Sequence, residues 1–245
     1  MSDAQNPYIV GEAALSTPEP RSDQNHNSPY GAYRDISKWE KLAKLGVGLD
    51  ICLAGMSLLC YLAAIIAEYT GKSETLYWDV NGDETLFLQA WNLLDTPGSY
   101  LYFISLVFYL IWVNQSMKNT WALSTDNTNK ISPGWAVGYY FIPIVCLWRP
   151  YQAMKWQWLE SSPPETSSTL VKSWWSLSVF GAFSGMIANF MLLADSVDYI
   201  PAYIASSIDD TGIIACSLLQ LLLIKKITLR QTLQAQGQEK LVLNC

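Results

Sequence analysis

Residues 132–158 read SPGWAVGYYFIPIVCLWRPYQAMKWQW, and the behaviour of this stretch decides how the rest of the chain is arranged. Its first part, the 16 residues Pro133–Trp148, carries no charge and ends at Arg149-Pro150. That is too short for a helix that crosses a hydrocarbon core about 30 Å thick, which takes roughly 20 residues. The segment is also too apolar and aromatic to lie free in water. We therefore expect residues 133–148, the SPGW segment, to lie in or on a membrane without crossing it.

Composition and hydropathy indicate an all-α integral membrane protein. Apolar residues make up 51% of the chain and charged residues only 15%, which is unusual for a soluble domain of 245 residues. Four apolar stretches surround the SPGW segment, and each is predicted to be a transmembrane helix. They are residues 45–67, 99–117, 173–194 and 204–224.

Polar tails are predicted on both sides of a membrane domain that covers residues 37–230. Residues 1–36 are rich in Asn, Ser, Pro and Asp, so they are expected to form a disordered cytoplasmic tail. They lack the basic start, apolar core and cleavage site of a secretory signal. Residues 231–245 are expected to form a second cytoplasmic tail.

The distribution of basic residues favours one topology. With four spans, the outer loops are residues 68–98 and 195–210, which hold ten of the 21 acidic residues but only one of the 15 basic residues, Lys72. Basic residues near span ends are retained in the cytoplasm. We therefore expect a multi-pass protein of the cell (inner) membrane with both termini cytoplasmic and a re-entrant or interfacial SPGW segment. The alternative, a short kinked fifth span at 133–148, removes the charge asymmetry.

The SPGW segment and its surroundings resemble a known family. The pattern consists of Pro133-Gly134-Trp135-Ala136-Val137-Gly138, Tyr140-Phe141-Ile142-Pro143, Leu147-Trp148-Arg149-Pro150-Tyr151-Gln152-Ala153-Met154-Lys155 and the pair Trp174-Trp175. It looks like the signature of the bacterial membrane proteins catalogued as domain of unknown function 4328. The resemblance covers about Leu42 to Arg230 and implies a multi-span architecture without an assigned activity. Cys146 stands where the family commonly has Asn, so no polar role is expected there.

This motif supplies the first group of candidate site residues. Arg149 keeps its charge and presents a planar fork of donors, while Trp148 and Tyr151 are amphipathic rings suited to the headgroup level. The motif therefore serves either as a structural stop with an aromatic belt or as a lipid or anion site. Its candidates are Pro133, Gly134, Trp135, Pro143, Trp148, Arg149, Pro150, Tyr151 and Gln152.

Polar side chains inside the predicted spans form the second group. Asp50 shares a helix face with small residues such as Gly46. In the predicted span at residues 173–194, Gly181-x-x-x-Gly185 forms another stripe of small residues, which continues to Asn189. Ionisable groups are expensive in lipid and often mark function. A proton or ion route would join Asp50 to Asp209 or Asp210 through Asn189 and Gln220. In the alternative, Asp209 and Asp210 lie at the outer interface and solvate a helix amino terminus, whose partial positive charge favours acids. The candidates are Asp50, Asn189, Asp209 and Gln220.

The sequence offers little for catalysis. The only histidine, His26, lies in the amino-terminal tail, so triads and zinc sites lack a ligand or base. No cofactor is expected, and a net charge of −6 disfavours nucleic-acid binding. We expect a membrane-embedded interaction or scaffold module, not an enzyme, with the lipid bilayer and a second copy or another membrane protein as its partners. The alternative is a small ion, proton or solute transporter or channel that uses Asp50.

Overall fold

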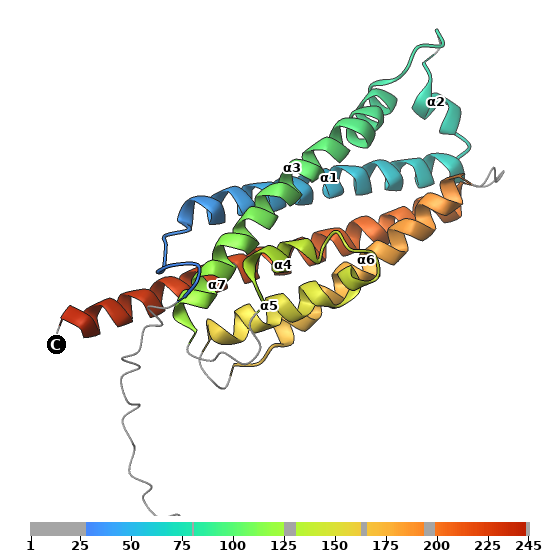
Figure 1. Ribbon diagram of the computed structural model, residues 1–245. Helices are drawn as coiled ribbons and strands as arrows, with labels where there is room; N and C mark the ends of the chain where they lie inside the picture. Colours follow the sequence, from blue (N-terminus) through green and yellow to red (C-terminus); the bar gives the residue numbers. More distant parts are fainter. Residues whose placement is uncertain (1–27, 80, 125–130, 163–165, 194–198, 244–245) are drawn as a thin grey trace, which may run out of the picture.

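The computed structural model describes residues 28–79, 81–124, 131–162, 166–193 and 199–243, which are mainly helical and contain no β-strand. Four long helices make up most of the molecule (Figure 1): α1 Ser37–Tyr69, α3 Leu86–Leu123, α6 Thr169–Leu193 and α7 Ile200–Leu243. The short ones are α2 Ser73–Tyr77, α4 Pro133–Gly138, the 3-10 turn η1 Val145–Leu147 and α5 Arg149–Glu160. Helix α7 packs along both α1 and α6, and α1 also packs along α3.

Three of these helices are long and apolar enough to cross a membrane. They are Ser37–Tyr69, Gly98–Leu123 and Ile200–Gly237, which contain the predicted spans 45–67, 99–117 and 204–224. The apolar residues of α1 lie all around the helix instead of along one face, as in a helix that is surrounded by protein or by lipid. The fourth predicted span falls on α6, which is not among these three helices, so a fourth span stays a prediction.

The SPGW segment begins beside the carboxyl-terminal half of α3 and runs back along it. Ser132 caps α4 by accepting a hydrogen bond from the Trp135 amide, and proline occupies the first turn, where no donor is needed. The Asn114 side chain donates to the Pro133 carbonyl oxygen at 3.0 Å. These contacts make α4 the first limb of a hairpin.

The second limb returns to the same end of α3. The chain reverses after Pro143, where Ile144 adopts a φ of 69°, and α5 then leads back. Near the end of α5, the Gln157 amide donates to the Ser116 hydroxyl on α3. The first limb begins at Asn114 of α3, and the second limb ends at Ser116, one helical turn away or less. The hairpin therefore starts and finishes beside the same part of α3.

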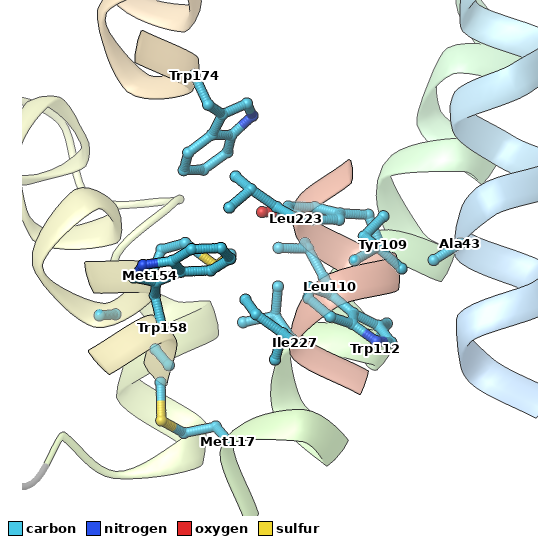
Figure 2. Packing of buried hydrophobic residues seen from close by; sticks show 14 of the residues in the cluster. Ala43, Tyr109, Leu110, Trp112, Met117, Met154, Trp158, Trp174, Leu223 and Ile227 are labelled. Atoms are coloured by element: carbon cyan, nitrogen blue, oxygen red, sulfur yellow. The ribbon is translucent and has the colours of Figure 1, made fainter. Parts of the chain in front are cut away.

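The side-chain core lies at one end of the bundle, which we call the basic end. Here the beginnings of α1 and α6 meet the carboxyl-terminal halves of α3 and α7 and the α4–α5 hairpin (Figure 1). Figure 2 shows side chains from these helices converging on one cluster. Trp112 and Ile227 are fully buried in it. The name reflects the lysines Lys38, Lys41, Lys44, Lys118, Lys155, Lys225 and Lys226.

The basic end includes residues that the sequence analysis assigned to the tails. Ile36 is buried in the core, and the Arg34 amide donates to the Asn119 side chain at 3.0 Å, so residues 28–36 pack against the helices. Helix α7 passes through the predicted boundary at residue 230 without a break, and Gln231 is fully buried. The remainder of the predicted amino-terminal tail, residues 1–27, lies outside the described residues.

Candidate functional site

A cavity of about 430 Å³ lies between α1, α3, α6 and α7, and three carboxylates line it. We call it the acidic cavity; its carboxylates are Asp50, Asp209 and Asp210. Among the described residues, no lysine, arginine or histidine lines it. Aromatic side chains form much of the remaining wall: Tyr61, Trp91, Tyr102 and Phe103. The cavity is therefore a negatively charged, aromatic-walled space within the helix bundle.

The position of Asp50 follows from a close crossing of α1 and α3. A Cβ atom on Gly46 would lie only 2.9 Å from the Ser105 Cα atom, so glycine is what allows the two backbones to approach. One helical turn later, the Asp50 Oδ2 atom accepts a hydrogen bond of 2.6 Å from the Ser105 hydroxyl. The Asp50 Oδ1 atom is buried and has no hydrogen-bond partner.

The Asp209 carboxylate occupies the space that two glycines leave on α6. A Cβ atom on Gly185 would lie 2.8 Å from Asp209 Oδ2, and one on Gly181 would lie 3.7 Å from Oδ1. The Ser184 hydroxyl donates to Asp209 Oδ1 at 3.0 Å. The Gly181-x-x-x-Gly185 stripe therefore makes room for a charged side chain from α7, in addition to letting the helices pack closely.

Asp210 is the most enclosed of the three carboxylates. Only 8% of its surface is exposed, and the Ser57 hydroxyl on α1 faces it. Its Oδ2 atom has no hydrogen-bond partner. A buried carboxylate oxygen without a donor is costly, so Asp210 is the carboxylate that most needs a ligand.

A second cavity of about 450 Å³ shares Asp50, Tyr102 and Asp209 with the acidic cavity. It extends toward the basic end, where the hydroxyl groups of Tyr109 and Tyr140 lie 3.2 Å apart. Tyr109 is buried and stacks on Trp112 of the core. The two cavities together follow the bundle up to the packed side chains of the basic end.

The structure brings all four intramembrane candidates to these two cavities. Asp50, Asn189 and Asp209 line the acidic cavity, and Gln220 lines the second one. The Asn189 amide donates to the Gly185 carbonyl oxygen of its own helix at 2.8 Å, and its side chain is exposed. Asn189 therefore lies at the edge of the cavity, and no hydrogen bond to a carboxylate is found for it among the described residues.

The motif candidates lie elsewhere, on the α4–α5 hairpin, and divide into two sets. Pro133 and Pro150 are buried and Tyr151 packs against the core, so these residues have a role in packing. The Arg149 guanidinium donates to the Gln152 Oε1 atom at 3.1 Å and lies over the ring of a tyrosine in the hairpin. The exposed members are Gly134, Trp135, Pro143, Trp148, Arg149 and Gln152.

The sequence analysis missed a buried polar cluster at the basic end. The Gln231 amide donates to the Ser116 carbonyl oxygen and to the Thr120 hydroxyl, each at 3.0 Å. Gln231 was missed because it lies beyond the predicted span, in a segment that we assigned to a solvated tail. Its spacing after Ile224 and Ile227 places all three on one helical face, and this was the available signal.

Comparisons with known proteins give one result. A family model described as a domain of unknown function (DUF4328) matches residues 88–229, which include the hairpin and the Asp209 and Asp210 positions. No curated protein matches the chain. No solved structure matches it either.

Proposed function

The chain belongs to the family described as a domain of unknown function (DUF4328), and we propose that it is a multi-pass cell-membrane protein with four spans, α1, α3, α6 and α7. Only 11% of the most apolar window of α1 is buried within the chain, so lipid would cover the rest. The lysines of the basic end favour a cytoplasmic position for that end and for both termini. The acidic residues Glu74, Asp79 and Asp83 lie beyond the other end of α1.

The α4–α5 hairpin fits a re-entrant or interfacial element at the cytoplasmic face. The outer surface of the hairpin is strongly apolar where the chain reverses, because the side chains of Phe141 and Ile144 are 66% and 70% exposed. Both limbs lead back to the basic end, which supports entry and exit on one side of the membrane. Trp148 and Arg149 lie close to the reversal, at the start of α5, and both side chains are exposed.

The activity that the cavities favour is the binding and movement of a cation. The carrying observation is the convergence of three carboxylates on one cavity whose lining has no basic side chain. A cation between these groups would relieve their mutual repulsion in a medium of low dielectric constant. The other candidate, an interaction or scaffold module, would explain the exposed apolar side chains of the bundle, but lipid explains them equally well. The cavity therefore favours a small transporter or channel.

A proteoliposome flux assay tests this proposal. Vesicles containing the full chain should take up protons, K⁺ or an organic monocation down a gradient, and Asp50→Asn should reduce the rate at least tenfold because one of three converging charges is removed. Asp79→Asn is the matched control, since this exposed loop residue lies outside both cavities. Wild-type vesicles that show no flux would contradict the proposal, and a stoichiometric partner in a native-detergent pull-down would then favour the module.

A further inference from the structure

We infer that the acidic cavity binds an organic monocation, an ammonium group that carries apolar substituents. The inference rests on the proposed cation transport and names its substrate class. Asp210 provides the first argument: its carboxylate is 8% exposed, lines the cavity and has an unpartnered Oδ2 atom. Asp50 adds a second buried oxygen without a partner. Because no basic side chain is found among the described residues that line the cavity, a cationic ligand would supply the compensating positive charge.

The spacing of the carboxylates disfavours a bare metal ion. Among the described residues, no group of three or more histidine, cysteine, aspartate or glutamate side chains could hold a metal. The carboxylates are instead distributed around a volume of about 430 Å³. Pockets for small organic molecules typically enclose roughly 300 to 1,000 Å³, so this space suits an organic ligand.

The aromatic part of the cavity wall has the chemistry that recognises organic cations. The rings of Tyr61 and Trp91 meet edge to face with their centroids 5.0 Å apart, and both residues line the cavity. Phe87 and Tyr203 pack against Trp91 with centroids at 5.7 and 6.0 Å, which fixes the indole in place. Aromatic faces attract ammonium groups within about 6 Å and also bury their apolar substituents. A hydrated inorganic cation gains little from such a wall.

Equilibrium binding of radiolabelled tetraethylammonium to the purified full chain in detergent tests the inference. This probe has a permanent charge and four apolar arms. We expect saturable binding that a hundredfold excess of K⁺ does not displace. Asp210→Asn should weaken binding at least tenfold, and Trp91→Leu should weaken it several-fold. Asp79→Asn, which changes an acid outside the cavity, should leave it unchanged.

A second measurement uses the unmodified chain, because a substitution at a buried position can also unfold the protein. Cys60 lines the acidic cavity, whereas Cys52 is exposed on the same helix and lines neither cavity. Tetraethylammonium should slow the labelling of Cys60 by N-ethylmaleimide at least threefold and leave the labelling of Cys52 unaffected. The second cysteine thus controls for general effects of the salt.

The outcomes separate this inference from the proposed function. Asp50-dependent flux of protons or K⁺ without tetraethylammonium binding or Cys60 protection would overturn the inference and leave the transport proposal standing. Saturable binding without any flux would support the site and contradict transport. Binding that K⁺ displaces at equal concentration, or that Asp210→Asn retains with an unchanged melting temperature, would also overturn the inference.

Discussion

The basic end and the half of the bundle that contains the acidic cavity are held together differently. At the basic end, large side chains such as Trp112 and Ile227 are completely buried. The Gln231 amide has partners within the chain there, whereas Gln157 Oε1 and Trp174 Nε1 have none. In the other half, Phe190 is 75% exposed and Leu59 68% exposed, while carboxylate oxygens inside the bundle lack donors. The first region is packed like a soluble domain, and the second leaves its apolar surface to the surroundings.

This difference assigns stability mainly to the basic end and the proposed function to the half that contains the acidic cavity. Close packing makes a region intolerant of changes in volume. A region whose apolar side chains face lipid tolerates such changes better, since lipid adapts to the altered surface. The acidic cavity lies in the tolerant half, beside a rigid end that holds the helices in register. Two substitutions and a change of pH test this division, beginning with the largest expected effect.

Trp112→Ala should destabilise the protein most. It removes a fully buried indole and its 3.1 Å hydrogen bond to the Thr228 hydroxyl, and such truncations cost about 3–5 kcal/mol. Thermal unfolding in detergent, followed by tryptophan fluorescence, should show a much lower melting temperature and a low folded yield. Phe183→Ala is the control, because that ring is 52% exposed on α6 and should cost less than about 1 kcal/mol. Equal losses would remove the proposed division.

Gly46→Ala should have an intermediate effect. The new methyl group would meet the Ser105 backbone at 2.9 Å, so α1 and α3 would have to separate, at a cost of about 1–3 kcal/mol. Gly48→Ala is a close match, since a Cβ atom at that position of the same helix meets nothing within 4 Å. Melting temperatures of the two variants should therefore differ clearly. An unaffected Gly46→Ala variant would show that the crossing is looser than described.

Acidification should produce the smallest effect, in the turn after α2. The amides of Asn81 and Asp83 donate to the Asp79 carboxylate at 2.7 and 2.9 Å, and these bonds lower the pKa of Asp79. A lowered pKa stabilises the turn above the ordinary value of 3.8, and this stabilisation is lost as the pH falls below it. Hydrogen exchange at the two amides should speed up at low pH after correction for intrinsic rates, with no change in global melting. A change in global unfolding would link this turn to the core.

The sequence predicted the helical architecture better than the interior of the bundle. Length and apolarity identify α1, α3 and α7, because a helix that crosses lipid needs both properties. The role of Gly185 was only partly predicted, since its partner Asp209 lies on another helix and helical spacing carries no information about contacts between helices. Gln231 was missed for a related reason: a polar residue in a helix beyond the apolar run resembles a solvated one until its partners on other helices are known.

Helix α7 joins the two regions as one continuous rod. No glycine or proline, the usual points of bending, occurs between Ile213 and Gln236. Asp210 and Gln231 are separated by about 30 Å of helix, in which Gly212, next to Asp210, is the one glycine; a tilt of this arm by about 5° shifts its far end by about 3 Å. At the basic end, hydrogen bonds from Gln231 to Ser116 and Thr120 hold this part of α7 in place, so the helix would tilt about this point. A rearrangement that opens or closes the cavity would then move Asp209 and Asp210, which lie on the part of α7 far from that point.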